Sequence, residues 1–262
     1  MTMAGGTMHP VGRVANDSPP LSPPRPLILE LVGLPGAGKT SVAEQLIPLL
    51  RSRGIACADR QLVFPGSPSR PVRYVKLAAF AARHPRILLS SLAYALAVLP
   101  VTSERMRSAL TLMIWTHRLK MSRTRRFSLV LLHEGLVHNA WCVLLRGKLW
   151  SIHAQRAALR SALSCVGLPF AFVYLDVALD VAIERVSGRS TTPLFNMNNR
   201  EESERLLATH GPLLNGIFRH AVEVTGAPYL RVDAGRPLQE VCAEVLSFVD
   251  RLTGWRGVAG DA

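Results

Sequence analysis

The sequence predicts an α/β fold: a five-stranded, mostly parallel sheet with helices on both faces. Short apolar runs alternate with longer segments of helical periodicity along residues 27–252. The runs are continuous, which is typical of parallel strands buried on both faces. In addition, a glycine-rich stretch joins the first run directly to a helical segment, the arrangement of a strand and helix that meet at a ligand site.

The strands and helices follow one another in a regular order. We predict strands at 27–32, 54–58, 127–132, 170–175 and 229–234, of which 54–58 has the weakest pattern. Helical periodicity covers 41–50, 72–84, 86–99, 103–121, 152–165, 179–187, 200–224 and 238–252. Residues 63–126 contain helical patterns but no predicted strand, and they are too long for a single crossover connection. We expect them to form a helical insertion over or beside the functional site.

The glycine-rich stretch has the complete G-x-x-x-x-G-K-[ST] spacing of a phosphate loop. Its glycines let successive backbone N–H groups turn toward phosphate oxygens. Lys39 would reach the β- and γ-phosphates, and the Thr40 hydroxyl would coordinate Mg²⁺. The fold is therefore predicted to be the three-layer sandwich of P-loop NTPases, with ATP and Mg²⁺ as cofactors. The nucleotide would contact Gly33, Pro35, Gly36, Ala37, Gly38, Lys39, Thr40 and Ser41.

Acidic residues follow two of the predicted strands. Glu134 comes directly after the run 127–132, where a charged side chain needs a partner. A strand end beside the phosphate loop supplies one, so Glu134 is the first candidate for a catalytic carboxylate and a Mg²⁺ ligand with Thr40. Asp59 follows the weak strand and is the alternative acid, although a solvated loop residue fits equally well. Arg60, its neighbour, is a candidate to meet an anionic substrate.

With these residues the chain resembles the P-loop kinases of the nucleoside-monophosphate and thymidylate kinase group. Besides the phosphate loop, the resemblance rests on Leu131–Leu136, on Tyr174–Arg189, and on Tyr229–Ala234 with the helix after it. It implies transfer of the γ-phosphate of ATP to a small acceptor such as a nucleoside monophosphate, a sugar or another metabolite. The chain departs from the group at His133, where an Asp often stands.

The resemblance also implies a lid-like region over residues 185–210. Arg185 and Arg189 lie one helical turn apart on one face and are candidate catalytic residues that neutralise the transferring phosphoryl group. The alternative is that they interact with the C-terminal end of their own helix, where cations are favoured. A different function also remains open: a nucleotide-dependent switch that docks on a partner or a membrane through its basic insertion.

Composition limits the partners and the compartment. The net charge of +13 favours polyanionic partners. Because the sequence contains no motif typical of nucleic-acid recognition, we do not expect nucleic acid to be a partner. The sequence contains no C-x-x-C pair, so neither a zinc site nor a disulfide framework is indicated. We expect reduced thiols in a cytoplasmic protein. Residues 1–26, with six prolines, are expected to be a disordered leader, and 253–262 a loose tail. The sequence does not predict an oligomeric state.

One segment, residues 87–101, has no charge over 15 residues. A membrane-spanning helix needs about 20 apolar residues, so this segment is too short to span. We expect a buried helix. An amphipathic helix at a membrane interface is the alternative, which leaves peripheral membrane contact open.

Overall fold

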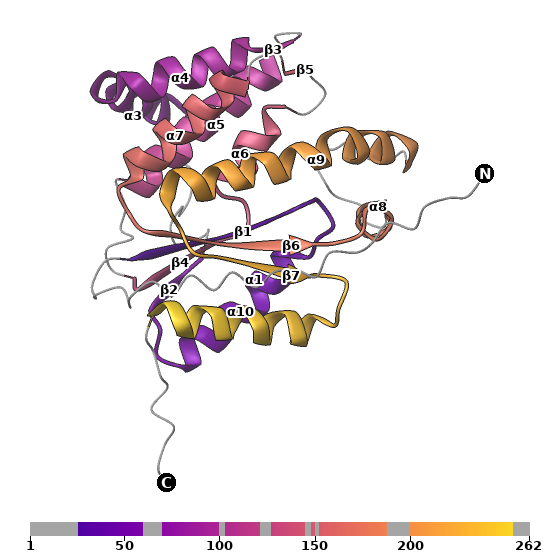
Figure 1. The fold of residues 1–262 in the computed structure, drawn as a ribbon. Helices are drawn as coiled ribbons and strands as arrows, with labels where there is room; N and C mark the ends of the chain where they lie inside the picture. The colour runs from indigo at the N-terminus through magenta and orange to yellow at the C-terminus, as the bar shows by residue number, and fades with distance from the viewer. Residues whose placement is uncertain are drawn as a thin grey trace, which may run out of the picture.

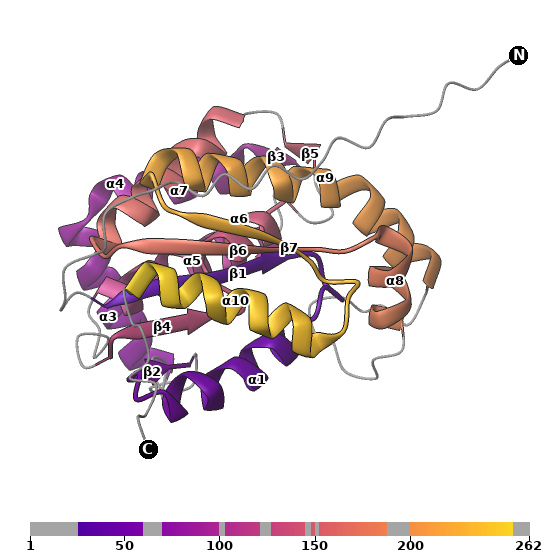
Figure 2. The ribbon, with the colours of Figure 1, turned by 60° about the horizontal axis from the view of Figure 1, so that its bottom comes forward.

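The structure, a computed structural model, describes residues 26–59, 70–99, 103–120, 127–144, 148–149, 152–187 and 200–253. The strands of its main sheet are β1 (Leu27–Gly33), β2 (Cys57–Ala58), β4 (Leu129–Leu132), β6 (Phe170–Asp176) and β7 (Tyr229–Asp233). Their order is β2-β4-β1-β6-β7, and every neighbouring pair is parallel (Figure 2). This confirms the predicted α/β fold and places β1 at the centre of the sheet.

Side chains alternate between the two faces of β1, and each face has its own core. Leu27, Leu29 and Leu31 pack with the helices α1 (Lys39–Ser52) and α10 (Leu238–Thr253). Ile28 and Val32 belong to the core on the opposite face. Because both faces of β1 are buried, the strand is apolar at nearly every position.

The opposite face is covered by α6 (Leu136–Cys142), α7 (Ile152–Val166) and α9 (Arg200–Thr225). A further layer lies outside α6 and α7, formed by α3 (Arg70–Arg83), α4 (Pro85–Leu96) and α5 (Ser103–Lys120) (Figure 1). In the same view α1 and α10 lie below the sheet. The helices of the predicted insertion therefore extend one face of the sandwich outward.

Two local features differ from what the sequence predicts. The short helix α6 was not predicted, because seven residues are too few to display helical periodicity. The insertion was expected to contain no strand, and this was wrong. β3 (Val98–Leu99) pairs with β5 (Lys148–Leu149) as a two-stranded antiparallel sheet. The two residues of β3 lie inside the uncharged run 87–101, so the sequence pattern does not separate them from the preceding helix.

The described part of the uncharged run, residues 87–99, covers most of α4 and the strand β3, and the expectation of a buried helix is only half right. Ile87, Tyr94 and Ala95 are buried, whereas several leucines of α4 face outward. Of the helices in the described ranges, none combines the length and the apolar character that crossing a bilayer would need.

Candidate active site

The phosphate loop occupies the turn between β1 and α1, at the carboxyl end of the central strand. Gly36 and Gly38 adopt left-handed backbone conformations, with φ of 86° and 82°. Gly38 is also the residue that caps α1, and it offers no side chain to the N–H groups of the first turn. That turn contains no acidic residue either. The positive end of a 14-residue helix is therefore left open to an anion.

Two glycines of the loop are needed for close packing. A Cβ at Gly33 would lie 2.7 Å from the carbonyl oxygen of Leu175, at the end of β6. A Cβ at Gly36 would lie 2.3 Å from the carbonyl oxygen of Ala182 in α8 (Leu179–Ser187). The loop thus fits directly against β6 and α8, and larger residues would displace it.

Lys39 is buried and folds back onto the loop. Its Nζ donates to the carbonyl oxygens of Gly33 at 2.6 Å and Leu34 at 2.9 Å. A cation held over the loop in this way is placed where phosphate oxygens would enter. Thr40 and Ser41, the next residues, have exposed side chains at the start of α1. A hydroxyl at this position can reach a metal ion that travels with the nucleotide.

Glu30 is a functional residue that the sequence analysis missed. Its side chain is fully buried in β1, on the face covered by α6. The carboxylate accepts three backbone hydrogen bonds: from Leu136 at 3.0 Å, Val137 at 2.9 Å and His138 at 3.2 Å. Glu30 therefore satisfies the free N–H groups at the start of α6, which its own capping residue leaves unpaired. A single carboxylate in an otherwise apolar strand was the signal.

Glu30 also explains the glycine after Glu134. A Cβ at Gly135 would lie 2.3 Å from the Cδ of Glu30, so no other residue fits without displacing the carboxylate. This contact holds the connection between β4 and α6 close to β1, beside the phosphate loop. It fixes the backbone that carries Glu134, whose side chain is partly buried.

Burial raises the pKa of Glu30 from 4.5 to about 7, against the hydrogen bonds from α6, which lower it. Because the folded protein holds this proton more tightly than the unfolded chain, its stabilising effect is complete below pH 4.5 and is lost as the pH rises toward 7. We expect the free energy of unfolding to fall by on the order of 3 kcal/mol over this interval.

Chemical denaturation of the wild-type protein and Glu30→Gln at several pH values tests this. The glutamine variant should lack that part of the pH dependence. Glu44→Gln, a change at an exposed position of α1, is the matched control and should behave like the wild type. Parallel curves for the wild type and Glu30→Gln would show that Glu30 does not titrate in this interval.

The charges of Glu134 and Lys39 both influence the pKa of Cys142. Burial raises the pKa of the Cys142 thiol to about 12; the Glu134 carboxylate raises it further, and the Lys39 ammonium lowers it. The Cys142 Sγ also lies 3.5 Å from Nε2 of His138, one turn earlier in α6. The strand-end acid and the loop lysine are thus brought to one place, next to α6.

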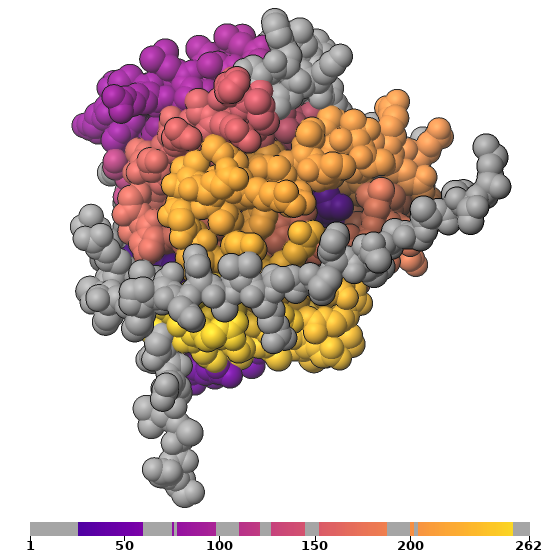
Figure 3. Space-filling view, viewed as in Figure 1, coloured from indigo at the N-terminus to yellow at the C-terminus, as the bar shows by residue number. Residues whose placement is uncertain are grey.

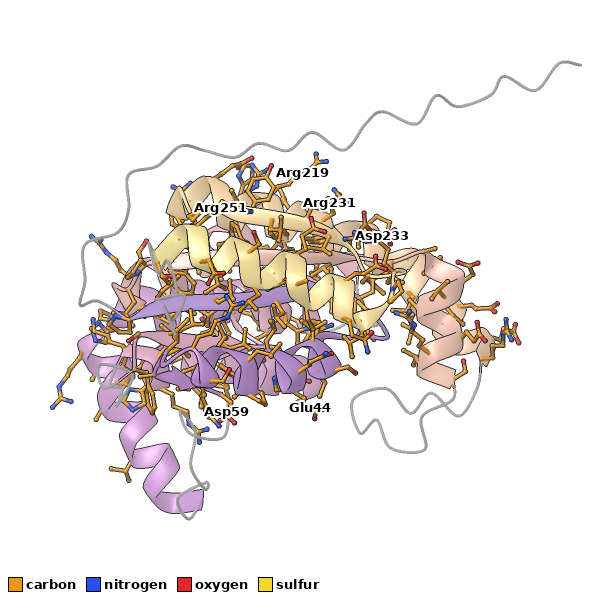
Figure 4. All side chains as sticks on the ribbon, turned by 90° about the horizontal axis from the view of Figure 1, so that it is seen from below. Glu44, Asp59, Arg219, Arg231, Asp233 and Arg251 are labelled. Atoms are coloured by element: carbon orange, nitrogen blue, oxygen red, sulfur yellow. The ribbon has the colours of Figure 1, made fainter. Side chains whose placement is uncertain are left out.

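Asp59 lies farther than Glu134 from the carboxyl end of the sheet. The register pairs Ala58 with Val130, so Asp59 is level with Leu131. Glu134 comes three residues later, up to about 10 Å further along the strand direction. Figure 4 shows Asp59 on the side of the molecule where α1 lies, with Glu44. Glu134 therefore lies nearer than Asp59 to the carboxyl end of β1, where the phosphate loop begins. Arg60 lies outside the described residues.

Arg185, in α8, reaches the phosphate loop through backbone atoms. Its Nη1 donates to the carbonyl oxygen of Ala234 at 3.1 Å and to that of Gly36 at 3.4 Å. The guanidinium thereby joins α8, the loop and the turn after β7. Arg189 lies outside the described residues, as does most of the predicted lid before α9. Figure 3 shows indigo surface from the start of the described chain between α8 and α9.

Arg185→Ala is expected to act mainly on nucleotide binding. Loss of two charge-assisted hydrogen bonds should loosen the loop and raise the KM for the nucleotide roughly tenfold, with a smaller change in kcat. Steady-state kinetics of the variant measure this split. Arg200→Ala is the control, because Arg200 makes an exposed ion pair with Glu204 on α9. A large fall in kcat at unchanged KM would instead place Arg185 on the phosphoryl group, as the sequence suggested.

Comparisons with known proteins give similarity to solved structures alone. No family model matches the sequence, and no curated protein matches it. Two of the matching solved structures are of deoxyadenosine kinase from M. mycoides. One, with the products dCMP and a flexible dCDP bound, is 13% identical with a TM-score of 0.49. The other, with bound dATP, is 14% identical with a TM-score of 0.48. Each match covers 85% of this chain, and 98% and 99% of the two neighbours.

Proposed function

We propose that this protein is an ATP-dependent phosphotransferase that moves the γ-phosphate to a small-molecule acceptor. One observation carries the proposal: the open N-terminus of α1 and the buried Lys39 face the same turn, which β6 and α8 pack against. Backbone N–H groups and one lysine are what a triphosphate requires. The start of α6, the neighbouring helix, is already occupied by Glu30, so it does not offer a second anion site.

The residues fit a magnesium ion bound with the nucleotide. Mg²⁺ prefers oxygen ligands and keeps several waters, so it needs only one or two groups from the protein. Thr40 has an exposed hydroxyl and Glu134 a partly buried carboxylate, and we assign them to this ion. When bound, Mg²⁺ would neutralise charge on the phosphate oxygens.

The residues of the chain would divide the remaining work. The loop backbone and Lys39 would hold the triphosphate and neutralise its charge. Glu134 would orient the acceptor or accept its proton, and Glu30 with Gly135 would keep Glu134 in place. Arg185 would hold the loop against α8. Arg189, in the candidate lid, would neutralise the transferring phosphoryl group.

The acceptor classes that we propose are nucleosides and their monophosphates, sugars and related metabolites. The test is release of ADP from ATP and Mg²⁺ in the presence of representatives of each class, with aminoglycosides included. Release that depends on one acceptor, together with a phosphorylated product detected by mass spectrometry, supports the proposal. ATP binding without any acceptor-dependent release would favour the alternative, a nucleotide-dependent binding protein.

A further inference from the structure

Positive charge is concentrated in one part of the chain. Residues 60–170 contain 17 Lys and Arg against two Asp and Glu, whereas the rest contains 14 against 16. The excess that gives the protein its net charge of +13 therefore comes entirely from the segment that includes α3, α4, α5 and α7. Glu134, one of the two acids, belongs to the candidate active site. Such a segment attracts surfaces of negative charge.

The outer face of α4 is apolar. Four of its leucines are exposed to solvent: Leu88 by 36%, Leu89 by 64%, Leu92 by 39% and Leu96 by 52%. The spacing places all four on one face of the helix, opposite the buried Tyr94. We call these four leucines the leucine face. Figure 1 shows α4 on the outside of the molecule, in the layer farthest from α1 and α10.

Basic side chains lie at the N-terminal end of α4. Arg86 is the only charged residue of the helix, and it is exposed, as is Arg83 just before it. Lys120, at the end of α5, is also exposed. The pKa of His84 is lowered by reduced contact with water and then by the charges of Lys120 and Arg83, which places these two cations around it. An apolar face thus begins at a cluster of cations.

We propose that α4 docks the protein on an anionic lipid bilayer. The leucine face would enter the boundary between headgroups and acyl chains, and Arg83, Arg86 and Lys120 would contact lipid phosphates. This is the arrangement of helices that lie in a membrane interface. The proposal does not depend on the phosphotransferase activity, because α4 packs chiefly on α5 and α7, away from the phosphate loop.

Two other occupants fit the surface less well. A second copy related by two-fold symmetry would bring the same basic segments face to face, and their like charges would repel. Nucleic acid would satisfy the cations but would leave four leucines against a charged backbone. A bilayer that contains anionic lipids complements both the leucines and the cations.

Vesicle sedimentation tests the proposal. The wild-type protein should bind vesicles of phosphatidylcholine and phosphatidylserine, bind pure phosphatidylcholine more weakly, and lose affinity as salt increases. The double variant Leu89→Gln/Leu92→Gln should bind the mixed vesicles roughly tenfold or more weakly. Arg83→Gln/Arg86→Gln should lose the preference for phosphatidylserine. Each of these variants should keep the circular dichroism spectrum of the wild type, since the changed side chains are exposed.

The controls match the variants in exposure. Leu49→Gln, on α1, changes a leucine that is 39% exposed, as is Leu92. Arg219→Gln/Arg251→Gln removes two exposed arginines on α9 and α10 (Figure 4). Both should bind vesicles like the wild type. The proposal is overturned if the wild type ignores phosphatidylserine vesicles, or if Leu89→Gln/Leu92→Gln binds them equally well. A dimer in light scattering that this same variant dissociates would assign the leucine face to a second copy.

Discussion

Glu134→Gln is expected to lower kcat by roughly 10²- to 10⁴-fold, the usual effect of removing a positioned acid–base group. ATP should still bind, because the backbone N–H groups of the loop and Lys39 do not depend on Glu134. The glutamine keeps the size of the side chain and removes its charge. Calorimetric binding of ATP, measured beside acceptor-dependent ADP release, separates the two effects.

Asp59→Asn is the control for Glu134. Asp59 is level with Leu131 and so lies farther than Glu134 from the carboxyl end of the sheet, where the phosphate loop begins. Its loss should therefore have the smaller effect on kcat. If Asp59→Asn is the more damaging change, the two assignments are reversed and Glu134 has a structural role at the strand end. If both variants keep full activity, neither carboxylate takes part in the reaction.

Lys39→Ala should reduce phosphoryl transfer by on the order of 10²-fold or more, since it removes a charge that neutralises the γ-phosphate at a buried position. The fold should remain, because the hydrogen bonds from the Lys39 ammonium to the carbonyl oxygens of Gly33 and Leu34 lie within the loop itself. Thermal unfolding and kinetics of the same preparation check both points.

The matched control for this change is Lys120→Ala, which removes an exposed lysine at the end of α5. It should leave phosphoryl transfer unchanged. Turnover near the wild-type level in Lys39→Ala would show that the phosphate loop is not the catalytic centre, and with it the proposed function would fail.

The local features of this protein are determined by the sequence alone. The apolar strands, their parallel arrangement and the loop from Gly33 to Thr40 follow from patterns that span a few residues each. The structure confirms the five predicted strands, including the weak one that became β2. A buried parallel sheet requires continuous apolar runs, so this part of the fold is visible without coordinates.

Only the tertiary structure decided how the candidate site is held. Glu30 supports α6 across 106 residues of sequence, and Arg185 joins Gly36 from 149 residues away. The outward position of the leucine face likewise depends on which side of α4 packs on α5 and α7. Periodicity shows that a helix has an apolar side, but contacts between distant segments determine whether that side is covered. Residues that act through such contacts leave no pattern in their own neighbourhood.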